Sequence, residues 1–191
     1  MIRATIIPRD HALRPAAELL IAEVYARHYS ARITAFPSTL ISMIGDGGTP
    51  LCAAGLRFAA DGFFSECYLD APVETVLSRL RRHPVRREKI FEVTSLASRA
   101  PHTVGSFLRK IIACGEAAGF DWAFFTATAP LKALLERLNV PLAPLADADR
   151  SRVANPDAWG SYYTLAPSVY AVHRDVVAAR IGRQARAAAY G

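Results

Sequence analysis

Cysteine is scarce in this chain, and the few cysteines are not arranged for a structural role. Only three of the 191 residues are cysteine, and they lie in apolar segments without the spacing of metal ligands: Cys52, Cys67 and Cys114. We therefore expect buried thiols in a reducing compartment rather than a disulfide scaffold. The five histidines also lack ligand spacing, so no metal site is expected.

Long apolar runs are missing as well. No segment is long and apolar enough to span a bilayer, and residues 1–15 are interrupted by Arg3, Pro8 and Arg9, unlike the apolar core of a signal peptide. We expect a cytoplasmic protein. Repeats, low-complexity tracts and dividing linkers are also absent, so the sequence predicts one domain over residues 1–191, with a basic, helical tail from about residue 174.

Apolar and positively charged residues are plentiful instead. Hydrophobic residues make up 52% of the chain, enough for a sizeable core, and the formal net charge is +6. That charge favours anionic partners, whether phosphates, an acidic protein, anionic lipid or nucleic acid. Because no aromatic–basic recognition motif is found, nucleic acid is not expected. A basic cluster that is either a solvated face or a docking surface consists of Arg79, Arg81, Arg82, Arg86 and Arg87.

The order of the predicted elements favours an α/β fold with a mixed sheet. Helical spacing of apolar residues predicts helices at 16–33, 72–82, 104–118 and 130–138. Apolar runs predict strands at 39–44, 51–58, 63–69, 89–97 and 121–128, with one or two more between 161 and 172. Turn residues separate the first three strands, so we expect an antiparallel meander followed by a strand-helix-strand-helix unit.

Glu92 is the first candidate for chemistry. It is the one carboxylate in the apolar segment 89–97. A charged side chain in a buried strand is costly unless it is paired or has a task. Glu92 is therefore either a structural carboxylate paired with Arg57 or Arg109, or a group that orients or deprotonates an amine.

A second group of candidates lies on the first predicted helix and beyond it. Residues at helical spacing form a stripe: Tyr25, Tyr29, Arg32 and Phe36. Such a stripe is commonly plain packing, but a guanidinium rarely faces a core without an anion, so Arg32 favours a binding role. Glu66 and Asp70 either pair locally or bind a substrate ammonium group.

The element order resembles the Gcn5-related N-acetyltransferase (GNAT) fold. In that fold the central strand leads into a loop and helix start whose backbone N–H groups hold the cofactor pyrophosphate. The resemblance assigns this role to Val104, Gly105 and Ser106, with Arg109 in the same helix. It also implies that the central strand parts from its neighbour and admits a pantetheine arm there, beside Thr126.

The GNAT resemblance is incomplete at two points. The glycine pattern that usually precedes the phosphate loop is not met between Arg99 and Gly105, and Leu135 stands where the family often has the tyrosine that protonates the leaving thiolate. Tyr162 or Tyr163, on a predicted late strand, would supply that acid instead, and Tyr163 is the candidate.

The chain is also similar to the acyl-homoserine-lactone synthases, which share this fold and take the acyl group from acyl carrier protein. Gly55-Leu-Arg57-Phe58 resembles their early-strand motif. Glu92-Val-Thr-Ser95 resembles their central-strand motif, with Ser95 in place of its arginine. This replacement argues against homoserine lactone as the product.

The most extensive resemblance, over nearly the whole chain, is to the thermostable hemolysin family. It is carried by five segments: Tyr25-Ala-x-x-Tyr29-x-Ala-x-Ile-x-x-Phe36-Pro, Tyr68-Leu-Asp-Ala-Pro-Val-Glu74, Phe91-Glu-Val-x-x-Leu-Ala97, Phe125-Thr-Ala-Thr128 and Trp159-Gly-Ser-Tyr-Tyr163. The family's name describes a lytic phenotype, which is a poor guide to molecular mechanism.

Together these resemblances imply a GNAT-like acyltransferase. It would move an acyl group from an acyl thioester, either acyl-CoA or the phosphopantetheine of acyl carrier protein, to an amine such as an amino acid, giving a signal-like or amphiphilic product. Glu92 and Tyr163 would be catalytic. The substrates would be bound by Tyr25, Tyr29, Arg32, Phe36, Arg57, Glu66, Asp70, Ser95 and Thr126.

Partners and alternatives remain open at the level of sequence. The basic cluster would dock an acyl carrier protein or the phosphates of CoA, because arginine suits both. The basic tail is a weak candidate for membrane association. Two alternative functions are a membrane-active cytolysin, as the family name suggests, and a non-catalytic protein that binds an acyl thioester.

Overall fold

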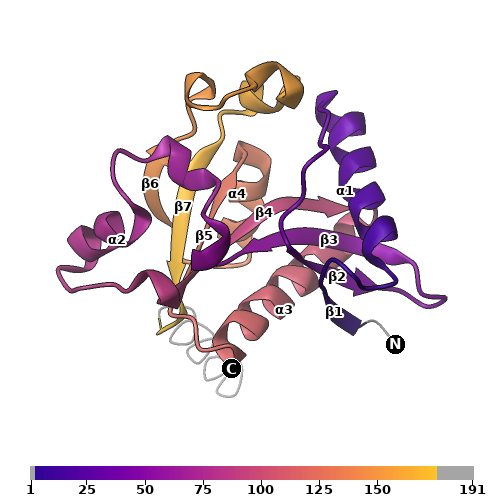
Figure 1. The fold of residues 1–191 in the computed structure, drawn as a ribbon, viewed down its shortest axis with the longest axis horizontal. Helices are drawn as coiled ribbons and strands as arrows, with labels where there is room; N and C mark the ends of the chain where they lie inside the picture. Colours follow the sequence, from indigo (N-terminus) through magenta and orange to yellow (C-terminus); the bar gives the residue numbers. More distant parts are fainter. Residues whose placement is uncertain (1–2, 176–191) are drawn as a thin grey trace, which may run out of the picture.

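The computed structural model describes residues 3–175, which form a seven-stranded mixed sheet with helices on both faces (Figure 1). The spatial order of the strands is β1-β2-β3-β4-β5-β7-β6. Their bounds are β1 Arg3–Ile7, β2 Thr39–Ile44, β3 Pro50–Arg57, β4 Ile90–Ser98, β5 Trp122–Ala127, β6 Ala143–Asp147 and β7 Ser168–His173. Only the β4–β5 pair is parallel; the other five pairings are antiparallel.

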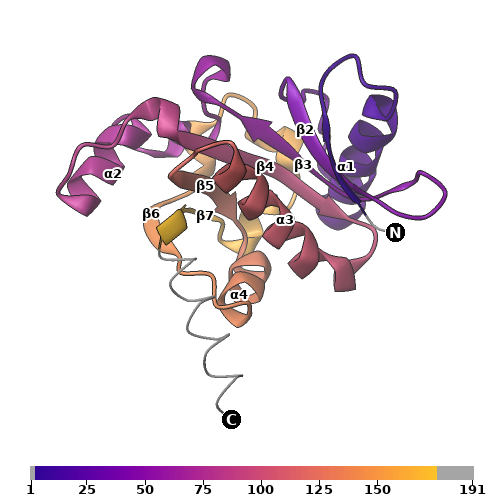
Figure 2. The same ribbon diagram turned by 90° about the horizontal axis from the view of Figure 1, so that it is seen from below.

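The described residues include four α-helices packed around the sheet. They are α1 Arg14–Tyr29, α2 Val73–Arg81, α3 Val104–Ala117 and α4 Ala129–Arg137. Figure 2 shows α1 on one side of the sheet and α3 and α4 on the other. The strand residues alternate accordingly: Leu40 and Ala53 pack against α1, whereas Ile41 and Cys52 belong to the cluster with α3.

Most predicted elements are present at nearly their predicted bounds. The strand at 39–44 is confirmed to the residue. At each end, the predicted limits differ by no more than one residue from those of β3, β4, β5, α2, α3 and α4. The first helix begins at Arg14 and ends at Tyr29, four residues before its predicted end. It ends there because Ser30 takes a left-handed conformation at φ 55°.

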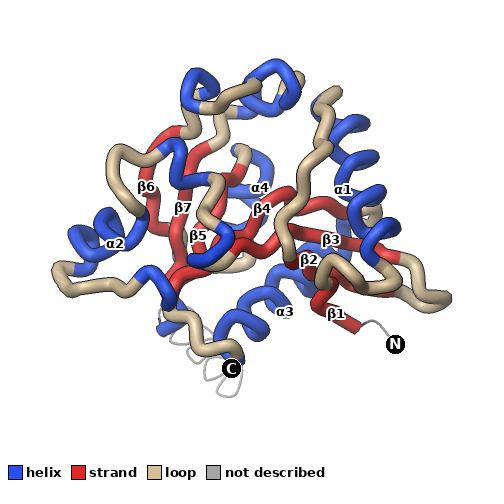
Figure 3. Tube along the Cα trace, in the orientation of Figure 1, coloured by secondary structure: helices blue, strands red, loops and turns tan. Residues whose placement is uncertain are grey.

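The predicted strand 63–69 is wrong. This segment contains the one-turn 3-10 helix Ser65–Tyr68, named η2, and the chain between β3 and α2 has no strand (Figure 3). Its backbone donors are used differently, since Phe64 N and Ser65 N donate to the Glu92 carboxylate. The neighbour of β3 is therefore β4, which extends the antiparallel part of the sheet.

The sequence did not predict the two edge strands, β1 and β6, and the prediction of strands between 161 and 172 is only partly right. β1 is short, and β6 contains Pro144, which suits an edge because proline has no N–H to donate. Residues 162–165 form a 3-10 turn, and the late strand β7 starts only at Ser168. Tyr162 and Tyr163 consequently do not lie on a strand. The predicted helical tail lies almost wholly outside the described residues.

Candidate active site

The parallel strands β4 and β5 part from each other in mid-sheet. They are paired only at Ile90–Trp122, Phe91–Ala123 and Glu92–Phe124. Just beyond, the register of β3 against β4 shifts, and Ser95 has a positive φ of 51°. A bulge of this kind bends its strand and interrupts the ladder, so β4 turns away from β5 after Glu92.

A cavity of about 630 Å³ occupies this parting, a volume typical of ligand sites. On the α3–α4 side its walls are apolar, with Leu108, Ile112, Leu131 and Leu134. On the other side its walls include residues that carry a hydroxyl or a guanidinium group: Tyr29, Tyr68, Ser65, Thr94, Arg32 and Arg57. The cavity therefore passes through the sheet, from a polar chamber on the α1 face to an apolar chamber between α3 and α4.

Aromatic rings gather at the polar chamber. Tyr162 stacks on Tyr25 with ring centroids 6.3 Å apart and meets Tyr29 edge-on at 5.3 Å. The loop that carries Tyr162 can press against α1 because Gly160 has no side chain: a Cβ there would lie 2.0 Å from the Tyr29 carbonyl oxygen. Burial raises the pKa of Tyr25 and of Tyr162, so both hydroxyls stay neutral at physiological pH.

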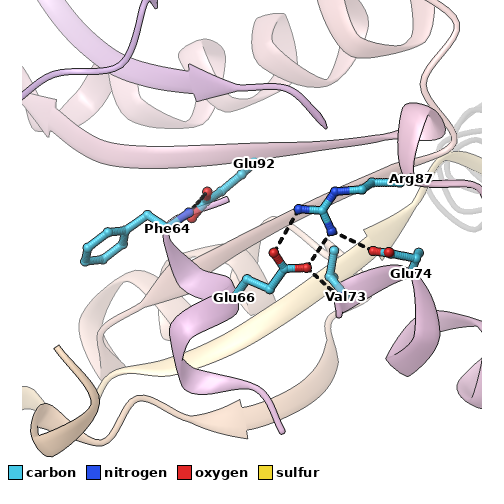
Figure 4. Close-up of polar contacts among 6 residues, drawn as sticks. All are labelled: Phe64, Glu66, Val73, Glu74, Arg87 and Glu92. Atoms are coloured by element: carbon cyan, nitrogen blue, oxygen red, sulfur yellow. Dashed lines mark hydrogen bonds and ion pairs between the residues drawn. The ribbon is translucent and has the colours of Figure 1, made fainter. Parts of the chain in front are cut away.

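Glu92 lies behind the cavity wall rather than in it. Its side chain is fully buried and is not among the residues that line the cavity. Oε2 accepts from Phe64 N at 2.6 Å and Oε1 from Ser65 N at 2.7 Å, with Phe64 directly beside the carboxylate in Figure 4. Desolvation raises the pKa of Glu92, while its hydrogen bonds to Ser65 and Phe64 and the Arg57 charge oppose that shift.

Two hydroxyl groups connect Glu92 to the cavity. The Ser65 side chain lowers the pKa of the Glu92 carboxyl, and its hydroxyl accepts a hydrogen bond of 2.8 Å from the Thr126 hydroxyl. Ser65 and Thr126 both line the cavity. Thr126 was a candidate from the sequence, but Ser65 was not, since nothing in its local sequence marks it.

Most of the predicted substrate-binding residues come together at the cavity. Its lining includes Tyr25, Tyr29, Arg32, Arg57, Ser95 and Thr126. Phe36 does not line it and instead packs against the α1 cluster. Tyr163 does not line it either, but its hydroxyl is 2.7 Å from the hydroxyl of Tyr68, which does. Of the predicted phosphate-loop residues only Val104 lines the cavity.

Glu66 and Asp70 do not line the cavity but form ion pairs elsewhere. The Glu66 carboxylate accepts from Arg87 at 2.6 and 2.8 Å and from Val73 N at 2.8 Å (Figure 4). Asp70 is exposed and pairs with Arg152 at 2.8 Å. The local pairing anticipated as one alternative is thus what the structure has, and the placement gives no support to binding of a substrate ammonium group.

The start of α3 is less open than the phosphate-loop prediction implies. A 3-10 turn at Pro101–Thr103 precedes the helix, and within it Thr103 N donates to Ala100 O and Val104 N to Pro101 O. Gly105 serves packing: a Cβ there would lie 3.3 Å from the Leu138 side chain, so glycine lets α3 approach the end of α4. Cofactor binding at Val104, Gly105, Ser106 and Arg109 stays a prediction.

One arginine of the basic cluster is held in ion pairs, and the other four are exposed. Arg87 is held by Glu66 and by Glu74, the latter at 2.7 Å, and its guanidinium stacks over Phe63. The other four side chains are exposed: Arg79, Arg81, Arg82 and Arg86. In the described part of the chain, no helix is long and apolar enough to cross a bilayer.

Comparison with models of known protein families shows which family the chain belongs to. The family model described as "Thermostable hemolysin" matches residues 7–177. The chain belongs to this family. None of the curated proteins matches the sequence of this thermostable hemolysin family member.

Solved structures show the fold of this family member to be GNAT-like, as predicted. The AHL synthase LasI superposes with a TM-score of 0.63 at 8% identity, covering 91% of this chain and 90% of LasI. FeeM, an N-acyl amino acid synthase from uncultured soil microbes, gives 0.62 at 12% identity, with 92% and 91% covered. A Lactobacillus plantarum protein assigned as an N-acetyltransferase gives 0.56 at 11% identity, with 90% and 97% covered.

Proposed function

We propose that this protein is an acyltransferase that moves an acyl group from a thioester to an amine. The observation that carries the proposal is the cavity through the parting of β4 and β5, which has an apolar chamber on one side and a polar chamber with a buried carboxylate behind it on the other. An acyl chain fits the first chamber and a polar acceptor the second. The names of LasI and FeeM, both synthases of acylated products, support this reading.

The residues divide into roles along the cavity. The thioester arm would pass between β4 and β5 beside Thr126, with the acyl chain between Leu108, Leu131 and Leu134. Backbone donors of the bulge at Ser95 would stabilise the oxyanion that forms when the amine attacks the carbonyl. Glu92, with its pKa raised by burial, would accept the amine proton.

The cationic residues would handle the negatively charged parts of the substrates. Arg32 and Arg57 line the polar chamber and would hold an anionic group of the acceptor. The exposed arginines at 79, 81, 82 and 86 would dock the donor, either an acidic carrier protein or the phosphates of CoA.

The burial of Glu92 favours a second candidate function. A carboxylate that accepts two backbone N–H groups is a good structural anchor for the 64–65 backbone. A protein built in this way could bind an acyl thioester without transferring the acyl group.

One assay separates the two candidates. Purified protein is incubated with acyl-CoA and acyl-carrier-protein panels and with amino-acid acceptors, and free thiol and acylated product are measured. We expect turnover by the wild type and a loss of about 100-fold or more in Glu92→Gln, the range of general acid–base catalysis. Glu88→Gln, which removes an exposed acid, is the control. Bound acyl thioester in a native mass spectrum without turnover would favour the second function.

A further inference from the structure

A buried base behind a wall poses a chemical problem for the proposed reaction. Glu92 is fully buried, and each of its oxygens already accepts a backbone N–H. Substrate in the cavity cannot reach it directly, because Glu92 does not line the cavity. A proton moving from an amine to Glu92 therefore needs a group that touches both.

Ser65 is in that position. Its backbone N–H donates to Glu92 Oε1 at 2.7 Å, its side chain lowers the pKa of Glu92, and the residue forms part of the cavity wall. The residue is only 1% exposed, so its hydroxyl is held by these contacts rather than by solvent. The position results from η2, which places Ser65 over β4 and β5 instead of in a strand of its own.

Thr126 fixes the direction of the Ser65 hydroxyl. A serine hydroxyl has one hydrogen to donate and two lone pairs that accept. The Thr126 hydroxyl donates to Ser65 Oγ at 2.8 Å and occupies one lone pair. The Ser65 hydrogen is then free to point at Glu92, and the second lone pair is left for a donor in the cavity.

We propose that Ser65 is the proton relay between the acceptor amine and Glu92, with Thr126 as the positioning residue that orients its hydroxyl. The inference rests on the proposed acyl transfer. As the nitrogen lone pair forms the C–N bond and the carbonyl π pair moves to oxygen, the amine proton passes to Ser65 Oγ, and the Ser65 proton passes to Glu92. The carbonyl then re-forms, the C–S bond breaks and sulfur leaves with the electron pair. Glu92 returns its proton through the Ser65 hydroxyl to water in the cavity, and the thiolate takes one from water.

The decisive variant is Ser65→Ala, assayed with the substrates that the wild type turns over. We expect kcat to fall about 100-fold while KM changes by less than about threefold, because the hydroxyl acts on proton transfer and not on binding. Ser65→Thr, which restores a hydroxyl, should recover most of kcat. Thr126→Val keeps the shape of the side chain and should lower kcat by about tenfold.

The matched control is Ser42→Ala. Ser42 is also a fully buried serine, and its hydroxyl donates to Cys52 O at 2.8 Å in the core, outside the cavity. It reports the cost of losing a buried serine hydroxyl without a relay, so its kcat should stay near the wild-type value. Thermal melts check that each variant is folded.

The outcomes separate the relay from the proposed function. Wild-type turnover with an unchanged kcat in Ser65→Ala overturns the relay and leaves acyl transfer standing. No turnover by the wild type on any donor overturns acyl transfer, and the relay with it. If Ser65→Ala does not fold, Thr126→Val decides: a kcat equal to that of the wild type overturns the relay.

Discussion

Arg87 makes contacts with residues of several segments that lie apart in the sequence. Its guanidinium binds Glu66 in the segment before α2 and Glu74 in the first turn of α2, and it lies 4.4 Å from the centre of the Phe63 ring. Hydrogen bonds to charged groups contribute about 1.5–3 kcal/mol each, and less where solvent screens them. This network fixes the chain around η2 and so also positions Ser65 over Glu92.

The network makes stability depend on pH through Glu66. The Arg87 guanidinium lowers the pKa of Glu66 from its usual 4.5. A lowered pKa in the folded state gives stability that is fully present above the ordinary value and is lost as pH falls through the folded value. We expect Glu66→Gln to lower the free energy of unfolding by about 1–2 kcal/mol at pH 7 and by much less near pH 3.

Urea unfolding at the two pH values measures this difference. Glu88→Gln, an exposed acid in the neighbouring turn, is the control and should change little at either pH. An equal loss for Glu66→Gln at pH 7 and pH 3 would contradict the role of its charge.

Glu92 and Ser65 show what sequence can reveal about single residues. Glu92 stands out because one acid in an apolar strand is costly, which is a local property of the chain. Ser65 is one of many serines, and its place at the cavity depends on contacts with Glu92 and Thr126, far away along the chain. Only the folded arrangement identifies it.

At the scale of elements, α3 and α4 form the apolar chamber. Leu108 and Ile112 of α3 face Leu131 and Leu134 of α4 across the cavity. If this chamber holds the acyl chain, its depth sets the longest chain accepted. The length preference should therefore depend on side-chain volume at these four positions.

Leu134→Trp tests the chamber. The larger side chain should fill part of it, so activity with long acyl donors should fall at least tenfold relative to short ones, because each lost methylene contact is worth about 0.8 kcal/mol. The ratio of kcat/KM values across donors of increasing length measures this. Ala133→Trp, at an exposed position of the same helix, should leave the profile unchanged. A profile that is equally unchanged in Leu134→Trp would exclude the chamber as the acyl site.

The sequence predicted some helices and strands correctly and others not. Strands such as β2 and β3 are largely apolar runs that must be buried, and this pattern is local. The segment 63–69 has the same kind of pattern, yet the demand of the buried Glu92 for hydrogen-bond donors turns it into η2. Edge strands β1 and β6 gave little signal because, among the described residues, each pairs with a single neighbouring strand.

At the scale of the whole molecule, the family name and the architecture suggest different kinds of activity. A cytolysin inserts apolar surface into lipid. In the described part of the chain, the large apolar side chains that are exposed are Ile6, Leu19 and Leu80, which belong to three different elements. Single exposed apolar residues of this kind are normal for protein surfaces.

An acylated product of the proposed reaction would account for lysis without a lytic protein. A long acyl chain joined to a polar amine is amphiphilic, and each buried methylene adds about 0.8 kcal/mol of membrane affinity. Lysis would then require the chemistry of the cavity, and the lytic agent would be a small molecule extractable from producing cells.

This account predicts that lysis follows turnover and not the protein itself. Purified, lipid-free wild type should release no dye from vesicles containing anionic lipid at micromolar concentration. Extracts of cells that express the wild type should lyse red cells, whereas extracts of cells with equal amounts of folded Glu92→Gln should not. Dye release by the pure protein, unchanged in Glu92→Gln, would instead establish a membrane-active cytolysin, because in that case the buried carboxylate and the cavity would have no part in lysis.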